Sequence, residues 1–322
     1  MSEPVLTIGI PSKGRLQENA FAFFARAGLT IAQARGAREY RGSVPGLPGL
    51  GVAFLSASEI AGELARGALH FGVTGADLLH ETLPDFAAQV SLLAPLGFGH
   101  ANVVVAVPEA WIDVQAMADI EDVAAGFRQR QKRRLRVATK YINLTRRFFK
   151  SHGIADYRIV ESLGATEGAP AAGQADIIVD ITTTGSTLAA NALKVLDDGT
   201  ILKSEAHLVA ARTAHWGPEA REMARRILAR IHAEEEARTR REIECAIITP
   251  LPEALAATLR DAGAEVMMAE AGRLWLLAPK DAAPILADHL ITAGATRVLV
   301  RATDEVFSAE NPLYDRLIAA VG

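Results

Sequence analysis

A turn of small polar residues separates an apolar strand-like run from a helix-like run near the middle of the chain. The apolar run covers 177–181, interrupted only by Asp180, and the sequence TTTGST follows at 182–187. A strand that leads into a helix through a glycine-containing turn directs free N–H groups and the helix dipole at one point, which favours a bound anion. Gly185 would let the backbone approach that anion closely. Hydroxyl side chains add donors, namely those of Thr182, Thr183, Thr184, Ser186 and Thr187.

The composition of this turn favours a phosphate site over an ordinary helix cap. A single serine or threonine at such a place would be explained by helix capping alone, and that alternative stays open. Five hydroxyl residues around one glycine exceed what a cap requires. The triphosphate-binding pattern G-x-x-x-x-G-K-[ST] does not occur in the sequence, and no lysine follows Gly185. We therefore expect a single phosphomonoester here.

Acidic residues accompany this turn. A carboxylate at the end of a buried strand is costly unless it is bonded, so Asp180 is either an exposed turn residue or an acceptor for the two hydroxyls of a sugar. Glu161 and Glu167 follow another strand, in the segment ESLGATEGAP. Carboxylates near a phosphate need a cation or hydroxyl groups between them, which indicates Mg²⁺ or a ribose.

Two further turns follow strands. In IPSKGRL, at 10–16, Lys13 and Arg15 would suit a polyphosphate, although an exposed turn with incidental charges is the alternative. In FGVTGADLL, at 71–79, the residues of interest are Gly75 and Asp77. Three such turns predict a cleft for a ligand with several phosphates.

The elements that carry these turns alternate between strand and helix. Apolar runs at 5–11, 51–56, 69–75, 100–108, 135–140 and 157–162 predict strands, and amphipathic segments at 16–29, 57–68, 118–134 and 142–153 predict helices. This alternation indicates an α/β fold with largely parallel sheets.

The end of the chain has a different organisation. A charged helix is predicted at 218–241, and six elements after it follow the order β-α-β-β-α-β, which is ferredoxin-like. We expect a separate domain of about 80 residues.

Composition limits the kind of protein. The chain has 322 residues with a net charge of −4, so no broad nucleic-acid or membrane surface is expected. It has no apolar run of 18 residues, a proline interrupts the first apolar segment where a signal peptide would continue, and the one cysteine, Cys245, suits a reducing compartment. A cytoplasmic location is expected.

Six motifs together resemble the ATP phosphoribosyltransferase family, the first enzyme of histidine biosynthesis. In chain order they are KGRL, FGVTGADLL, LGFGHANVVVAVP, RVATKYINLTRRFF, GATEGAP and DITTTGSTLAAN. The resemblance covers about 5–210, and the last two motifs are its most specific. The C-terminal unit is similar to the regulatory domain of the long form of this family.

The resemblance implies a catalytic part, 1–238, made of two α/β lobes like a type II periplasmic binding protein. Lobe I would hold about 1–103 and 188–238, lobe II about 104–187, and a regulatory domain 239–322. The chain would cross between lobes near 98–105 and just after Thr187.

The implied reaction joins adenine N1 of ATP to C1′ of 5-phosphoribosyl 1-diphosphate and releases pyrophosphate. The hydroxyl turn, from Thr183 through Thr187, would hold the 5′-phosphate. Asp180 and Glu167 would face the ribose, with Glu161, Gly75 and Asp77 in the same cleft. Lys13 and Arg15 would lie by the phosphates of pyrophosphate or ATP. The nucleotide side is expected to hold Thr139, Lys140 and Tyr141.

The resemblance also implies partners. Mg²⁺ would be carried mainly by substrate phosphates, and no protein ligands for it are assigned. Histidine is the expected inhibitor, although the C-terminal domain could serve assembly alone. The family forms homo-oligomers, dimers or hexamers, and its short forms need a separate regulatory subunit.

One departure and two rival functions remain. Many family members have an arginine and an aspartate where this chain has 54–60, FLSASEI, and Arg35, Arg38 or Arg41 could supply the missing cation. A solute-binding or sensor module would explain the strand order but not the hydroxyl turn. A phosphosugar enzyme of another class, such as an isomerase, would explain one phosphate site but not the second, cationic turn.

Overall fold

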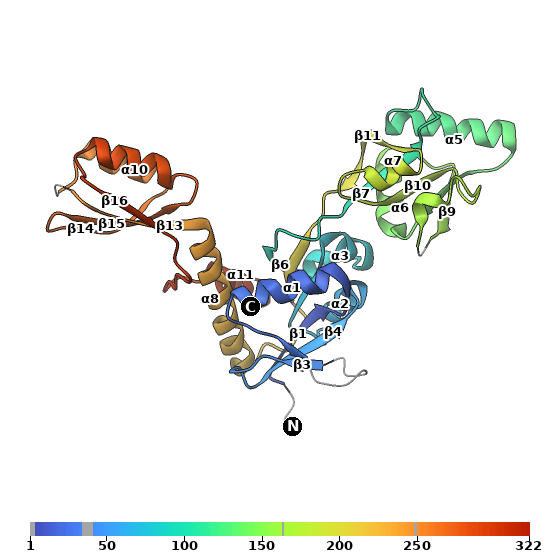
Figure 1. The fold of residues 1–322 in the computed structure, drawn as a ribbon. Helices are drawn as coiled ribbons and strands as arrows, with labels where there is room; N and C mark the ends of the chain where they lie inside the picture. Colours follow the sequence, from blue (N-terminus) through green and yellow to red (C-terminus); the bar gives the residue numbers. More distant parts are fainter. Residues whose placement is uncertain (1–3, 34–40, 163, 248–249) are drawn as a thin grey trace. The chain divides into compact units, whose positions relative to one another are not determined.

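The computed structural model describes residues 4–33, 41–162, 164–247 and 250–322 (Figure 1). The chain divides into two compact units. The first comprises Met1–Phe23, Thr30–Ala220 and Ala319–Gly322, and the second comprises Phe24–Leu29 and Arg221–Ile318. The first unit contains two β-sheets, and the second contains one.

The larger sheet of the first unit has the strand order β2-β3-β4-β1-β5-β12-β6. Its central strands are parallel, since β1 pairs in parallel with both β4 and β5, whereas β12 runs antiparallel to β5 and β6. The strands are β1 (Leu6–Pro11), β2 (Ala32–Gln33), β3 (Arg41–Ser43), β4 (Leu50–Leu55), β5 (Phe71–Gly75), β6 (Val90–Pro95) and β12 (Ala206–Ala211). The helices between these strands are α1 (Gly14–Arg26), α2 (Ala57–Ala65), α3 (Ala76–Thr82) and α4 (Phe86–Gln89), and the first three each follow a strand. The predicted strand-to-helix turns at Lys13 and at Gly75 therefore both exist.

The smaller sheet of this unit has the strand order β11-β7-β10-β8-β9. Here β8 pairs in parallel with β9 and β10, and β7 runs antiparallel to β10 and β11. The strands are β7 (Asn102–Pro108), β8 (Leu135–Thr139), β9 (Tyr157–Glu161), β10 (Ile177–Thr182) and β11 (Leu193–Leu202). Its helices are α5 (Met117–Gln131), α6 (Ile142–Ser151), the short 3₁₀ helix η1 (Thr166–Gly168) and α7 (Ser186–Ala190).

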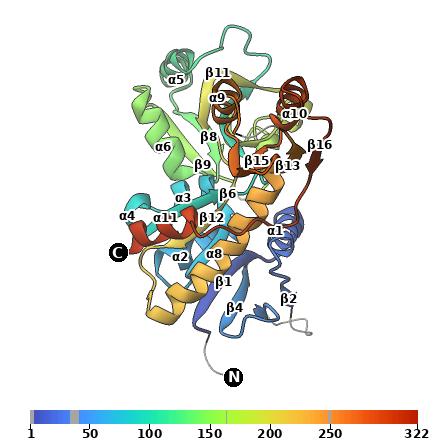
Figure 2. The ribbon, with the colours of Figure 1, turned by 90° about the vertical axis from the view of Figure 1, so that its left-hand side faces the viewer.

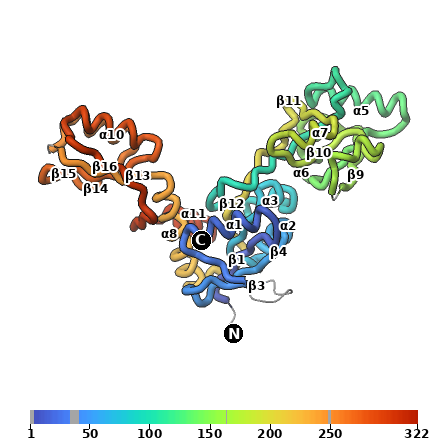
Figure 3. Tube along the Cα trace, viewed as in Figure 1, coloured from blue at the N-terminus to red at the C-terminus, as the bar shows by residue number. Residues whose placement is uncertain are grey.

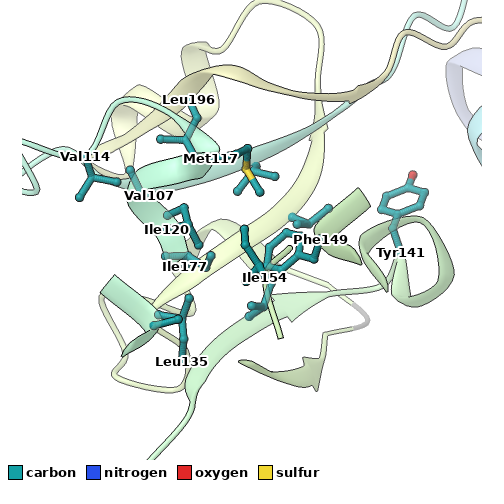
Figure 4. Packing of buried hydrophobic residues seen from close by; sticks show 14 of the residues in the cluster. Val107, Val114, Met117, Ile120, Leu135, Tyr141, Phe149, Ile154, Ile177 and Leu196 are labelled. Carbon is teal, nitrogen blue, oxygen red and sulfur yellow. The ribbon is translucent and has the colours of Figure 1, made fainter. Parts of the chain in front are cut away.

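Both faces of this smaller sheet are buried, which explains the continuous valine run in β7. On one face Val103, Val105 and Val107 join a cluster with side chains from α5 and α6 (Figure 4). On the other face Val104 and Ala106 join a cluster with Ala169, which directly follows η1, and Leu188 of α7. The two motifs GATEGAP and DITTTGSTL are thus placed on the same face.

The chain passes between the two sheets twice, and the second passage differs from the prediction. The first passage lies between β6 and β7, at 96–101, and the second between β11 and β12, at 203–205, as the tube in Figure 3 traces. A crossing was expected just after Thr187, but β11 still pairs with β7 in the smaller sheet. The helix-like run that follows the TTTGST turn forms a helix only as far as Ala190, because Ala192 adopts a left-handed backbone conformation (φ 53°) and β11 begins directly afterwards.

The second unit contains most of a long helix, most of the closing helix and a four-stranded antiparallel sheet. The long helix is α8 (Pro218–Thr239), continuous over its whole length in Figure 2. The sheet has the order β14-β15-β13-β16, and the unit's other elements are β13 (Arg240–Ala246), α9 (Glu253–Asp261), β14 (Glu265–Glu270), β15 (Arg273–Pro279), α10 (Ala283–Thr292), β16 (Val298–Arg301) and α11 (Pro312–Val321).

The ferredoxin-like prediction is confirmed, because β13 to β16 follow the order β-α-β-β-α-β with β13 and β15 at the centre of the sheet. Leu255 and Leu259 of α9 and Leu286 and Leu290 of α10 pack against one sheet face. The apolar pattern of these helices also predicts core packing for Ile285, but that side chain is 62% exposed. The closing helix α11 was not predicted. The domain boundary expected at 238–239 remains a prediction.

Candidate functional site

The hydroxyl turn is folded around its own side chains. Gly185 has φ 79°, a conformation that glycine adopts without strain, and its N–H donates to Thr182 Oγ1 at 2.8 Å. Thr184 Oγ1 and Ser186 Oγ lie 3.0 Å apart. Thr183 donates its hydroxyl to the carbonyl of His100 at 2.9 Å. A turn held in shape before a ligand arrives loses little conformational freedom when it binds one.

A cavity of about 370 Å³ lies beside this turn and includes a cation from another segment. Its lining residues are Arg15, His100, Ala101, Ile181, Thr182, Thr183, Thr184, Ser186 and Thr187. Arg15 comes from the start of α1, more than 160 positions before the turn. The structure therefore brings together two segments that the sequence had predicted to bind phosphate groups.

Asp180 occupies the last part of β10, just before this turn. Its Oδ1 accepts the N–H of Ile181 at 2.8 Å. Burial raises the pKa of its carboxyl, and the charge of Glu167 raises it further, whereas the Ile181 N–H and Lys140 act in the opposite direction. The structure thus groups Asp180, Glu167 and Lys140, all predicted site residues, in one electrostatic environment. A partly desolvated carboxylate next to a lysine can stabilise positive charge that develops close to it.

Thr139, Lys140 and Tyr141 form the step from β8 to α6. Thr139 is fully buried, and its hydroxyl accepts the Tyr141 N–H at 2.8 Å. Tyr141 is 1% exposed, and Lys140 Nζ lies 5.0 Å from the centre of its ring. Burial raises the pKa of the Tyr141 hydroxyl, and the nearby Asp77 carboxylate raises it further. Tyr141 is therefore a neutral hydrogen-bond donor, and Lys140 remains exposed beside it.

Asp77, on α3, is the acceptor for that tyrosine. It is 4% exposed, its Oδ2 accepts the Tyr141 hydroxyl at 2.7 Å, and its Oδ1 accepts the Ser204 hydroxyl at 2.8 Å. Gly75 is needed for this arrangement, because a Cβ at that position would lie 2.2 Å from Asp77 Oδ1. Both oxygens of Asp77 are thus engaged within the protein.

Of the predicted site residues, the cavity lining includes Arg15 and the hydroxyl residues of the turn, whereas Asp180, Glu167 and the residues around Tyr141 and Asp77 lie outside it. The other predicted residues also lie outside the lining. Lys13 is exposed in the turn before α1, and Glu161 is exposed at the end of β9. The segment with the missing family arginine serves as a helix start, since Ser56 caps α2 and exchanges hydrogen bonds with Glu59. Arg41 is exposed on β3, and Arg35 and Arg38 lie outside the described residues.

Two residues of this region were missed from the sequence. Ser204 bonds Asp77 across 127 positions, and Glu81 bonds α6 across 62. Neither belongs to a glycine-rich turn. The spacing of Asp77 and Glu81, four positions apart on one helix, is the one signal that could have linked Glu81 to the site.

The described ranges of the chain also bear on metal binding and on membrane spanning. No group of three or more His, Cys, Asp or Glu side chains is gathered there as a protein-only metal site would require. The carboxylates of Asp180 and Glu167 suit a cation that is bound mainly by phosphates, as hard oxygen ligands do. Among the helices of those same ranges, none is long and apolar enough to span a membrane.

Comparison with known proteins gives one family. The family model described as ATP phosphoribosyltransferase matches residues 56–233. The ATP phosphoribosyltransferase of Nitrobacter winogradskyi is 54% identical over 319 residues, covering 97% of each chain, and that of Bradyrhizobium diazoefficiens is 55% identical, covering 99% of each.

Among solved structures, the ATP phosphoribosyl transferase (HisG:HisZ) complex from Thermotoga maritima aligns with a TM-score of 0.55 at 24% identity. The alignment covers 70% of this chain and 96% of that one, which shows a common fold. The fold class expected from the sequence is thereby confirmed. Identity above 50% along almost the whole chain also decides against the sensor-module and isomerase alternatives. The chain belongs to the ATP phosphoribosyltransferase family, the metal-dependent transferases that catalyse the first step of histidine biosynthesis.

Proposed function

We propose that the cavity beside the hydroxyl turn binds 5-phosphoribosyl 1-diphosphate. The observation that carries this proposal is that Arg15 and the hydroxyls of Thr184 and Thr187 line one cavity. Residues 183–187 hold the 5′-phosphate. The diphosphate extends toward Arg15 and the exposed Lys13, because cations favour the most highly charged part of the substrate.

The reaction places particular demands on this site. Adenine N1 already carries a lone pair, so its attack on C1′ needs no strong base. As the bond from N1 to C1′ forms, the bond from C1′ to the diphosphate oxygen breaks, and the electron pair leaves with pyrophosphate. The site must therefore stabilise a positively charged sugar and a negatively charged leaving group.

Asp180 and Glu167 serve the sugar. Their carboxylates accept the ribose hydroxyls and place negative charge near the developing oxocarbenium ion. The raised pKa of Asp180 supports this role, since a partly desolvated charge interacts more strongly than a solvated one. Glu161, exposed at the end of β9, supplies a further acceptor at the rim.

The nucleotide side of the site is formed by Thr139, Lys140 and Tyr141. Lys140 is exposed beside the buried Tyr141 ring and is available to an ATP phosphate. Because both oxygens of Asp77 are engaged, we assign Asp77 and Gly75 to the positioning of Tyr141 rather than to direct contact with substrate.

The metal of this family is proposed to be Mg²⁺. When bound to the substrate phosphates it neutralises charge on the departing pyrophosphate. On the protein side, Asp180 and Glu167 are the residues proposed to face it, and Arg15 complements it by binding phosphate oxygens.

The ferredoxin-like part is proposed to regulate or assemble the enzyme. Trp275 and Leu299 lie on the sheet face opposite α9 and α10, on either side of Glu244, and are 39% and 40% exposed. An exposed apolar sheet face supports homo-oligomers, dimers or hexamers, and histidine is the proposed inhibitor. The alternative partner that we propose is a separate regulatory subunit. A cytoplasmic location completes the proposal.

Substitution in the hydroxyl turn tests the proposed phosphate site. Thr184→Val and Thr187→Val each remove a donor to a charged phosphate, a loss of about 1.5–3 kcal/mol per bond. Each is expected to raise KM for 5-phosphoribosyl 1-diphosphate by more than tenfold, with a smaller change in KM for ATP. Turnover is followed by pyrophosphate release and by the changed ultraviolet absorbance of the adduct.

Thr258→Val is the matched control, because its hydroxyl bonds only a carbonyl on α9 among the contacts described for it. Equal effects of the turn variants on both substrates, or none, would show that the turn is only a helix cap. No consumption of either substrate by the folded chain with Mg²⁺, both alone and with a regulatory subunit, would refute the substrate assignment.

A further inference from the structure

The first turn of α6 has an unusual cap. The first four N–H groups of a helix find no partner inside the helix, and Ser, Thr, Asp or Asn normally bonds them. The residue at this position in α6 is Tyr141, which makes no capping bond with its side chain. Its hydroxyl instead bonds Asp77, and its ring lies at the edge of the apolar cluster in Figure 4.

Glu81 takes over the capping role from another helix. Its carboxylate accepts the N–H of Asn143 at 2.9 and 3.0 Å through its two oxygens, and the N–H of Leu144 at 2.9 Å. A carboxylate at a helix N-terminus also interacts favourably with the helix dipole. Glu81 belongs to α3, which follows a strand of the larger sheet, whereas α6 follows a strand of the smaller one.

The capping is reciprocal. Side chains of α6 bond carbonyls in the last turn of α3, since the Asn143 amide donates to the Glu81 carbonyl at 3.0 Å and Arg147 donates to the His80 carbonyl at 2.6 Å. Orphan carbonyls at the end of a helix are thereby satisfied by a neighbouring helix. Residues of α3 therefore bond the free N–H groups at the start of α6, and residues of α6 bond the free carbonyls at the end of α3.

Asp77 and Glu81 both bond the start of α6. They are four residues apart, so they lie one turn apart on the same side of α3. Asp77 bonds the Tyr141 side chain, and Glu81 bonds the backbone just after it. The start of α6 is thus fixed at two points, and Lys140 lies immediately before the first of them.

We propose that Glu81 is a positioning residue for the transfer reaction. By capping α6 it holds Lys140 and Tyr141, the proposed nucleotide side, at a fixed place relative to β5 and α3. The inference rests on the proposed assignment of Lys140 and Tyr141 to the nucleotide side. Glu81 itself touches neither substrate in this scheme.

Three variants test the inference in the full-length chain. Glu81→Ala removes the cap, and Glu81→Gln keeps one oxygen that can accept. Asp119→Ala is the matched control, because Asp119 accepts the N–H groups of Gln115 and Ala116 at the start of α5, which carries none of the proposed site residues. The measurements are steady-state kinetics, ATP affinity by calorimetry, and hydrogen exchange at 142–145 and 115–119.

Glu81→Ala is expected to lower kcat by roughly 5- to 30-fold, which corresponds to about 1–2 kcal/mol. It is also expected to weaken the binding of ATP. KM for 5-phosphoribosyl 1-diphosphate should stay within twofold, because the hydroxyl turn lies on other elements. Glu81→Gln should recover most of the loss. Asp119→Ala should speed exchange at 115–119 without changing kcat.

Two results would overturn the inference. If Glu81→Ala speeds exchange at 142–145 but leaves kcat and ATP affinity unchanged, the cap is only structural. If Glu81→Ala and Asp119→Ala alter kinetics alike, the effect reflects general stability. ATP affinity requires no turnover, so an inactive wild-type chain would refute the reaction assignment, and calorimetry would still decide whether Glu81 positions the nucleotide side.

Discussion

The bond between Tyr141 and Asp77 offers the sharpest test of how the site is held. Tyr141→Phe removes a hydroxyl that donates to a carboxylate at 2.7 Å, where the two residues are 1% and 4% exposed. Water has little access to replace the donor, so the full value of a hydrogen bond to a charged group applies, about 1.5–3 kcal/mol. We expect a loss of this size in the free energy of unfolding of the first unit.

Ser204→Ala separates the stabilising role of Asp77 from its positioning role. Ser204 bonds the other oxygen of Asp77 but does not belong to α6. Both variants should lose stability by denaturant unfolding, whereas only Tyr141→Phe should raise KM for ATP strongly. A loss under about 0.5 kcal/mol for Tyr141→Phe, or the same kinetics for both variants, would contradict this account.

The tyrosine also predicts an alkaline response. Its pKa is raised in the folded chain, so below about pH 10, the pKa of a free tyrosine, the folded and unfolded states are both protonated and stability is unaffected. Above that pH the unfolded chain loses the proton and the folded chain keeps it. Stability should then fall by up to about 1.4 kcal/mol per pH unit. The same titration of Tyr141→Phe should lack this component, and equal slopes would refute it.

Three further predictions concern other parts of the chain. Asp180→Asn should lower kcat by about 10²–10³-fold. The same variant should raise the melting temperature at pH 7, because the raised pKa of Asp180 means that folding disfavours its charged form. A lower melting temperature of Asp180→Asn would contradict this reasoning. Asp176 should make the chain sensitive to acid. Burial opposes the charge of its carboxyl, but hydrogen bonds from Arg133 and Arg136 outweigh burial and lower its pKa to about 2. About 2 kcal/mol of folding stability that is present above pH 4 should therefore be lost between pH 4 and 2, and Asp176→Asn should abolish this loss. Histidine at millimolar concentration should inhibit the full chain but not a chain truncated after Arg240. If histidine changes neither the rate nor the melting temperature of the full chain, the C-terminal part serves assembly and not regulation.

The strand-to-helix turns were predictable because their chemistry is local. Gly185 and its neighbouring hydroxyls specify a turn through residues within a few positions, and Arg15 could be assigned to phosphate from its own segment. The sequence therefore predicted both walls of the cavity. It could not show that they meet, since that depends on how the two sheets are connected.

The parts that escaped prediction depend on distant partners. Ser204 and Glu81 have ordinary sequence surroundings and gain a role only through contacts with Asp77 and α6. Strand β11 was missed because the alanine-rich segment before it favours a helix, and the left-handed conformation of Ala192 that ends this helix leaves no sequence signal. Tertiary pairing with β7 decided the outcome.

The contact between Gly75 and Asp77 restricts the order in which this site can change during evolution. Any side chain at position 75 would place its Cβ 2.2 Å from an Asp77 oxygen, so it is harmful while that carboxylate remains. If the carboxylate is removed first, the Tyr141 and Ser204 hydroxyls lose their hydrogen-bond acceptor. An unsatisfied buried hydroxyl is itself destabilising. A double replacement can therefore be tolerable although each first step is not, and the two positions are expected to persist or to disappear together in descendants of this sequence.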